Sequence, residues 1–399
     1  MADESERLNM PISTAELERR WKAVRKAMEE QRIDVLVMQN NNDFMGGYVK
    51  YFTDLPATNG YALTVLFPRD EGMTMIGQGP FGGDRMLPPE GDGVRRGVKR
   101  VMTSPSYSAA PFTKENDAAL AEKSLEAYSG ATIGLVGTGA IPSAFVDYLK
   151  RGKLSNAKFV EASDLVDDIK AIKSPEEIGR MRQCAHMQDK CMDAAFKTMA
   201  PGKKDIEIAA IAEQTGHSYG SEQGLFMCAS GPVGTAPLQA NRHFQSRTIQ
   251  AGDQLSLLVE SNGAGGFYTE LGRTCVLGKA SQEMKDEFAF VLEARKFTLS
   301  LLKPGTSCKD IWDAYNEFMK KNGRPEEKRL YCHGQGYDMV ERPLVRFDEP
   351  MKLKANMIVS CHPTYALAGS FNWACDNYLI TDHGPERLHQ FPEIITEIG

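Results

Sequence analysis

Two strand-like runs joined by a glycine-rich turn, residues 255–274, constrain the fold of this chain more than any other segment. Apolar residues dominate the first run, and the turn 262–266 contains three glycines. Turn residues between two strand-like runs are typical of a β-hairpin. A hairpin here would bring the carboxylates of Glu260 and Glu270 together, on a scaffold rigid enough to position catalytic groups.

Other side chains of the ligand type follow in the last third of the chain, each beside a strand-like or glycine-rich segment. His333 lies in a segment with two glycines, His362 follows the apolar run 357–361, and Cys375 precedes the strand-like run 378–380. They are scattered in sequence, but strand ends of one sheet can converge in space. We therefore expect a polar site built from these groups.

Length and composition favour a two-domain enzyme that acts on a small molecule. A chain of 399 residues is long enough for two domains, which we place at 1–164 and 165–399. The net charge is −6 and the basic residues are scattered, so we expect neither nucleic acid nor a membrane as a partner. The polar, acidic amino terminus does not resemble a signal peptide, so the expected compartment is the cytoplasm.

The eight cysteines include no close CxxC pair, which argues against a zinc knuckle and a disulfide framework.

Periodicity predicts an α/β domain in the first part of the chain. A helix is expected over 14–31 and another over 143–151, with strands near 35–38, 61–67, 72–76 and 132–136. The glycine- and proline-rich stretch 77–108 is expected to be a long surface loop.

The remaining part of the chain reads as strands packed under helices, an α+β arrangement. Ser174, Pro175 and Glu177 form a capping-box pattern that starts a helix reaching Met199. Further helices are expected over 204–217, 282–302 and 308–322.

Five segments together resemble the creatinase, prolidase and methionine aminopeptidase family. They are 172–178, 251–253, 266–274, 333–336 and 358–363, and their order and spacing are more specific than any one of them alone. The resemblance implies a pita-bread catalytic domain over 165–399 and a creatinase-type α/β domain over 1–164. It also implies a homodimer whose pocket is completed across the subunits.

The same resemblance suggests where the site departs from the peptidases of that family, which hold two metal ions with two aspartates, a histidine and two glutamates. Glu260 falls near the first aspartate position, Glu270 takes the second, and His333 matches the histidine. His362 and Cys375 stand where the two glutamates belong. Carboxylates are needed to bridge paired hard cations, so a two-metal site is not expected.

Four residues are implied to contact the substrate besides Cys375. Glu341 falls at the position of a substrate-contacting histidine, and Arg342 beside it offers a charge. Asn241 replaces a further catalytic histidine of the family, for which the nearby His243 is a substitute. We expect Glu341 and Arg342 to anchor a charged end of the substrate.

Two forms of chemistry remain open for the site. Metal-free acid–base catalysis by His333, His362, Glu270 and Glu260 is the favoured expectation, with no cofactor. The alternative is one zinc or iron ion held by Glu270, His333, His362 and Cys375.

The leading functional prediction is a creatinase-like hydrolase of a small non-peptide amide or amidine. One histidine would activate water while a glutamate holds the attacked group. Three alternatives stay open. They are a lyase that breaks a C–S or C–C bond by proton abstraction, a mononuclear metal-dependent Xaa-Pro-type peptidase, and a non-catalytic binding module.

Overall fold

The computed structural model of the chain describes residues 9–40, 47–56, 61–238, 240–367 and 369–399. It divides into two compact units, Met1–Lys170 and Ala171–Gly399. The boundary proposed from the sequence, after residue 164, falls inside helix α5 (Ser163–Lys170), the last element of the first unit. Among the described helices, none combines the length and the apolar character needed to cross a membrane.

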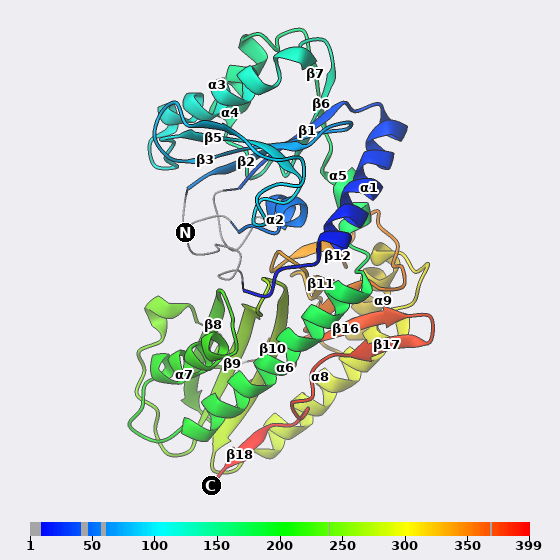
Figure 1. Ribbon diagram of the computed structural model, residues 1–399. Helices are drawn as coiled ribbons and strands as arrows, with labels where there is room; N and C mark the ends of the chain where they lie inside the picture. Colours follow the sequence, from blue (N-terminus) through cyan, green and yellow to red (C-terminus); the bar gives the residue numbers. More distant parts are fainter. Residues whose placement is uncertain (1–8, 41–46, 57–60, 239, 368) are drawn as a thin grey trace. The chain divides into compact units, whose positions relative to one another are not determined.

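The first unit is built on a mixed sheet with strand order β4-β5-β3-β2-β1-β6-β7 (Figure 1). Its strands are β1 (Val35–Asn40), β2 (Leu63–Pro68), β3 (Met73–Gln78), β4 (Asp84–Met86), β5 (Val98–Ser104), β6 (Thr132–Val136) and β7 (Lys158–Glu161). Its other helices are α1 (Thr14–Gln31), α2 (Gly47–Thr53), α3 (Lys114–Ser124) and α4 (Ser143–Arg151). Strand β1 pairs antiparallel with β2 and parallel with β6, and every one of its residues is buried.

Helix α1 has the bounds that periodicity predicted. Ser13 caps it by accepting a hydrogen bond from the Glu16 amide, and the chain leaves it at Arg32, whose φ of 55° ends the helical repeat. Its buried apolar residues recur at helical spacing and face the core. They are Leu17, Trp21, Val24 and Met28.

The expectation of a long loop over 77–108 was wrong, because this stretch supplies β4 and β5. Strand β5 pairs with β3 and β4. The sequence pattern does not predict this strand, since Lys99 and Arg100 interrupt the apolar alternation. Ion pairs accommodate both charges: Lys99 with Glu71, and Arg100 with Asp84, whose Oδ2 lies 2.6 Å from the guanidinium Nη2.

The second unit holds two larger sheets, with orders β18-β10-β9-β8 and β12-β11-β13-β16-β17, and a β14-β15 ribbon (Figure 1). The first sheet consists of β8 (Gly224–Pro232), β9 (Asp253–Asn262), β10 (Tyr268–Leu277) and β18 (Thr396–Ile398). The second consists of β11 (Cys332–Gly334), β12 (Glu341–Leu344), β13 (Ile358–Cys361), β16 (Asp376–Thr381) and β17 (Gly384–Arg387), and the ribbon of β14 (Ala366–Leu367) and β15 (Ser370–Phe371).

Four helices accompany these sheets, and the prediction of strands packed under helices is confirmed. They are α6 (Pro175–Thr198), α7 (Asp205–Ser218), α8 (Gln282–Leu301) and α9 (Cys308–Lys321). The capping box of α6 is formed as predicted: Ser174 Oγ accepts from the Glu177 amide at 3.2 Å, and Glu177 Oε2 accepts from the Ser174 amide at 2.7 Å. Helix α6 packs on β9 and β10 around an apolar core that includes Met192, Phe196 and Leu257.

Candidate active site

The hairpin of β9 and β10 places two carboxylates side by side, as predicted. Glu270 lies directly opposite Glu260 in the antiparallel register, and both side chains are buried. Facing residues on one side of such a pair have Cβ atoms about 4.5–5.5 Å apart. The glycine-rich turn 262–266 joins the two strands in this register.

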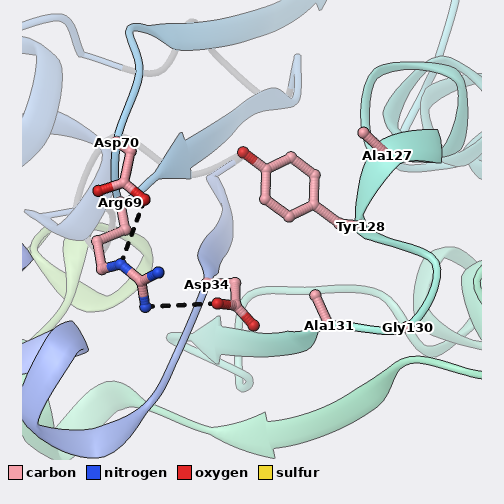
Figure 2. Close-up of a pocket in the computed structure, with 7 residues that line it drawn as sticks. All are labelled: Asp34, Arg69, Asp70, Ala127, Tyr128, Gly130 and Ala131. Atoms are coloured by element: carbon pink, nitrogen blue, oxygen red, sulfur yellow. Dashed lines mark ion pairs between the residues drawn. The ribbon is translucent and has the colours of Figure 1, made fainter.

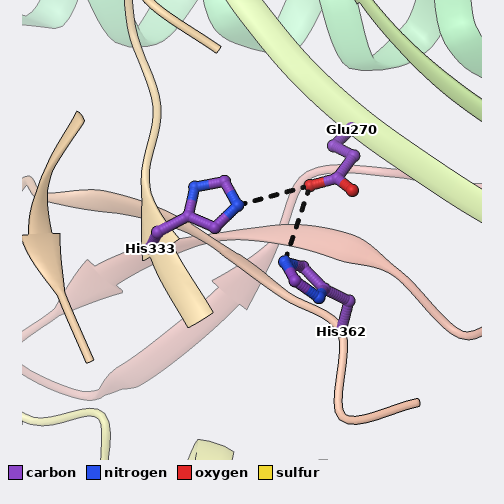
Figure 3. Close-up of side chains that lie close together, drawn as sticks. All are labelled: Glu270, His333 and His362. Atoms are coloured by element: carbon purple, nitrogen blue, oxygen red, sulfur yellow. Dashed lines mark ion pairs between the residues drawn. The ribbon is translucent and has the colours of Figure 1, made fainter. Parts of the chain in front are cut away.

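Two histidines from the other sheet complete a compact group around Glu270. Nε2 of His333, on β11, lies 3.7 Å from Glu270 Oε2, and Nε2 of His362, which follows β13, lies 4.0 Å from the same oxygen. Figure 3 shows both rings directed at this carboxylate. The ligand atoms of the three residues all lie within 4.8 Å of one another, and all three residues are buried.

A short contact between the two sheets holds this group together. Gly272 of β10 and Cys375, just before β16, exchange both backbone hydrogen bonds, at 3.2 and 3.3 Å. The indole of Trp373 lies against Gly272, where an added Cβ would sit 1.4 Å from Nε1. Glycine at 272 is therefore required for the close approach of the two sheets.

The hydrogen bond made by Nδ1 of His333 leaves the other ring nitrogen, Nε2, available as a metal ligand. Its Nδ1 lies 3.1 Å from the Gly334 carbonyl oxygen, and a carbonyl can only accept, so Nδ1 carries the proton. In the neutral ring, Nε2 then presents a lone pair toward Glu270. Burial lowers the pKa of His362 to about 4, so this ring is uncharged at neutral pH. A carboxylate facing two imidazole nitrogens is a suitable setting for a cation.

These residues fit one metal ion. Two imidazole nitrogens and a carboxylate oxygen form a donor set that suits zinc or ferrous iron. Nδ1 of His362 is buried and has no hydrogen-bond partner among the described residues, so only packing and any bound ion would orient this ring.

The two carboxyls have pKa values displaced in opposite directions. Burial raises the pKa of Glu270, but electrostatic interactions with the His362 and His333 rings and a hydrogen bond from Ser360 outweigh burial, and the pKa is lowered. The pKa of Glu260 is raised well above its usual value, first by burial and then by the charge of Glu270. Two neighbouring carboxyls with displaced pKa values can serve as base or ligand and as acid.

Cys375 lies beside this group but is not one of the clustered ligands. Its Sγ is 3.2 Å from Ser360 Oγ, and that hydroxyl donates to Glu270 Oε2 at 2.7 Å. Burial, followed by the charge of Glu270, raises the pKa of the thiol well above its usual value. A neutral buried thiol is a poor nucleophile. The role of Cys375 as a fourth metal ligand stays a prediction.

The residues expected to contact substrate occupy different settings. Glu341 forms a buried ion pair with Lys173, and Arg342 binds Glu349 through two hydrogen bonds, of 3.0 and 2.6 Å. These ion pairs give both side chains a structural role, and their role in substrate binding stays a prediction.

The residues that the resemblance placed near a missing catalytic histidine lie at the surface. Asn241 precedes the 3₁₀ helix η4 (Arg242–Phe244), which contains His243, and both residues are exposed. The buried group of Glu270, His333 and His362 includes neither of them. Their role in binding substrate also stays a prediction.

Sequence reasoning missed three polar residues that orient the site: Ser360, Gln335 and Asn377. Gln335 Nε2 donates to Glu260 Oε1 at 3.1 Å, and Asn377 Oδ1 accepts from the Glu270 amide at 2.6 Å. The sequence contains a pattern that could have indicated these residues. Gln335 lies between the two glycines of the segment 333–336, and Ser360 and Asn377 are polar residues within strand-like apolar runs.

A separate surface pocket in the first unit offers no comparable chemistry. Figure 2 shows Arg69 in it between Asp34 and Asp70, with an ion pair of 3.4 Å to each. The other lining residues are Ala127, Tyr128, Gly130 and Ala131. The guanidinium in this pocket is thus already neutralised.

The model of metallopeptidase family M24 matches residues 179–382, about half of the chain. The chain belongs to this family. The matched range contains Glu260, Glu270, His333, His362 and Cys375. Family membership supports the prediction of an enzyme of the hydrolase class.

Curated relatives of this M24 chain include peptidases. The Xaa-Pro dipeptidase of Pyrococcus horikoshii is 28% identical over 277 residues, which cover 67% of this chain and 76% of the relative. An uncharacterized hydrolase/peptidase of Sinorhizobium fredii is 25% identical over 397 residues and covers 95% of both chains.

Solved structures confirm the predicted fold class, an α/β amino-terminal domain followed by an α+β pita-bread domain. The X-Pro aminopeptidase of Thermotoga maritima superposes with a TM-score of 0.78 at 18% identity, covering 95% of this chain and 99% of that one. Zinc-substituted aminopeptidase P of E. coli, in complex with product, gives 0.72 at 18% identity, with 97% of each chain covered.

Proposed function

We propose that this M24 hydrolase uses a single metal ion, held by Glu270, His333 and His362, to cleave the amide bond of short Xaa-Pro-type substrates. The observation that carries the proposal is the buried cluster itself, with its three ligand atoms within 4.8 Å of one another. The Xaa-Pro dipeptidase relative supports the substrate class. The comparisons thus favour the metal-dependent alternative over the metal-free creatinase-like prediction.

The residues around the cluster supply most of the remaining chemistry. A bound divalent ion would polarise the substrate carbonyl and lower the pKa of a coordinated water. Ser360 holds Glu270 by donating to Oε2, and the lowered pKa of Glu270 keeps this carboxylate charged. Because the site is buried, these electrostatic interactions are stronger than they would be in water.

Glu260 is the proposed general acid. Its raised pKa favours the protonated form, and Gln335 donates to Oε1, which leaves Oε2 as the oxygen that can carry the proton. A protonated carboxyl beside the cluster can transfer that proton to the leaving nitrogen as the C–N bond breaks. Glu260 then returns to its resting state by taking a proton from water.

A second candidate function is metal-free hydrolysis of a small non-peptide amide or amidine. The specific observation in its favour is the carboxyl pair, whose pKa values are displaced in opposite directions beside two histidines. Such a set can supply both acid and base without a metal. In this mechanism a neutral imidazole, His333 or His362, would accept the proton of the attacking water.

A chelator experiment distinguishes the two candidates. The protein, purified without an affinity nickel column, is assayed on glycyl-proline and on a panel of small amides and amidines, before and after dialysis against a chelator. The proposal expects proline release that chelation abolishes and that zinc or ferrous iron restores. Chelator-resistant turnover of a non-peptide substrate would replace it with the second candidate.

A pair of glutamate variants provides the matched control. Glu270→Gln removes a cluster carboxylate and should abolish proline release, whereas Glu317→Gln changes an exposed residue of α9 and should not. Equal activity in the two variants would contradict the proposal.

A further inference from the structure

A chain of buried hydrogen bonds leads from His389, which lies outside the predicted site residues, to the carboxyl of Glu260. His389 lies just after β17, and its Nε2 is 3.2 Å from Asn377 Oδ1. Asn377 Nδ2 donates to Gln335 Oε1 at 2.7 Å, and Gln335 Nε2 donates to Glu260 Oε1 at 3.1 Å. Asn377 and Gln335 are fully buried and His389 is 3% exposed, so water cannot easily replace these partners.

The direction of the chain is fixed by backbone groups at both ends. The Glu270 amide donates to Asn377 Oδ1, so this atom is an oxygen and the other atom of the amide must donate. Gln335 Nε2 also donates to the Met339 carbonyl at 2.8 Å, which makes it the amino group. All donors therefore point toward Glu260.

His389 must contribute a donor to this arrangement. Asn377 Oδ1 has only lone pairs to offer, so Nε2 of His389 carries a proton. On the other side of the ring, Nδ1 lies 3.5 Å from Asp189 Oδ1. Asp189, on α6, is itself fixed by the amides of Gln390 and Phe391, at 2.8 and 3.1 Å.

We propose that His389 is a positioning residue for the site, acting through Asn377 and Gln335 to fix Glu260 Oε1 as an acceptor. With Oε1 engaged by Gln335, Oε2 is the oxygen of Glu260 that can face the substrate in the general-acid step. The same Asn377 oxygen holds the Glu270 amide, so His389 also supports the β10 backbone beside the cluster. The catalytic part of this proposal rests on the function proposed above, whereas the hydrogen-bond chain does not.

The first test needs no substrate. In protein labelled with ¹⁵N-histidine, His389 should give a slowly exchanging Nε2–H signal, assigned by its loss in His389→Gln. Asn377→Ala should shift this signal, because the proton loses its acceptor. An Nε2 without a proton, or a signal unchanged in Asn377→Ala, would overturn the proposal whatever the enzyme hydrolyses.

The second test is kinetic, on whichever amide the enzyme turns over. His389→Leu should lower kcat about 10- to 100-fold, the range for outer residues that orient a site, and leave KM near the wild-type value. His389→Gln keeps a side-chain N–H donor and should recover most of the rate. His383→Leu changes an exposed histidine in the turn between β16 and β17 and should have no effect.

A double-mutant cycle separates positioning from a general packing defect. If His389 acts through Gln335, the variant with both His389→Leu and Gln335→Leu should be no slower than the slower single variant. Independent, multiplying losses would overturn the proposal, as would equal rates for His389→Gln and His389→Leu in folded protein. If the wild type hydrolyses no amide, the proposed function fails, and the histidine spectrum still decides the hydrogen-bond chain.

Discussion

Replacing Asp376 by asparagine should destabilise the second unit strongly, because three guanidinium groups converge on this carboxylate. Asp376 is fully buried at the start of β16. Its Oδ1 accepts from Arg273 at 2.7 Å and from Arg387 at 2.8 Å, and its Oδ2 accepts from Arg295 at 2.5 Å. Arg273 belongs to β10, so the network joins the two sheets that carry Glu270 and His362.

The expected loss follows from the burial of the partners. Arg273 is 1% exposed and Arg295 is 3% exposed, and Asp376→Asn leaves these cations without their shared charge. Removing one partner of a buried ion pair typically costs about 3–5 kcal/mol. A unit of 229 residues, from 171 to 399, loses about 2–4 °C in melting temperature per kcal/mol, so the shift should be about 6–20 °C.

The loss of stability caused by Asp376→Asn should also depend on pH. Burial raises the pKa of Asp376, but the charges of Arg273, Arg295 and Arg387 outweigh burial, and the pKa in the folded protein is lowered. A carboxylate whose pKa is lowered by folding stabilises the folded protein at pH values above its pKa in the unfolded chain, about 3.9. This stabilisation is lost progressively as the pH falls from there toward the lower pKa of the folded state. The advantage of the wild type over Asp376→Asn should be full at neutral pH and should shrink below about pH 4.

Calorimetry and urea unfolding, monitored for each unit, measure this difference. Asp382→Asn, at an exposed position in the following turn, is the matched control and should melt like the wild type. A loss below about 1 kcal/mol for Asp376→Asn, the usual scale for exposed ion pairs, would show that this buried network does not stabilise the unit as expected.

Three further substitutions test individual contacts of the site. His333→Ala should lower turnover by about 100- to 10,000-fold while circular dichroism stays native, and near-native activity would remove His333 from the mechanism. Cys375→Ser should retain most of the activity and the bound metal, because the thiol is neutral and lies outside the ligand cluster; a joint loss of metal and activity would show that the thiolate is a ligand. Gly272→Ala should yield little soluble protein, since the new Cβ would lie 1.4 Å from Trp373 Nε1, and a normal melting curve would contradict this packing.

Local patterns made much of the fold predictable. The capping box at Ser174 fixed the start of α6, and the glycine-rich turn fixed the pairing of Glu260 with Glu270. Both depend on residues close in sequence, whose physical preferences act without the rest of the protein. The gathering of His333 and His362 at Glu270 joins distant segments, and the family resemblance indicated it.

Other features depend on tertiary partners that a single sequence does not reveal. Strand β5 was missed because its charges find ion-pair partners on neighbouring segments. Cys375 was a ligand in the alternative with one metal ion; its thiol lies against Ser360, outside the cluster of Glu270, His333 and His362, and its ligand role stays a prediction. The hydrogen bond between His389 and Asn377 joins residues of different strands and turns, and no local sequence pattern predicts it.

One metal ion at Glu270, His333 and His362 is the basis of the proposed function, and metal analysis of the purified protein measures it. Inductively coupled plasma mass spectrometry should find about one zinc or iron per wild-type chain, because the three ligands form a single site. The double variant of His333→Ala and His362→Ala should hold almost none, and the exposed-site variant His383→Leu should match the wild type. An unchanged metal content in the double variant, two ions per chain in the wild type, or a wild type that takes up neither metal on reconstitution would contradict the account.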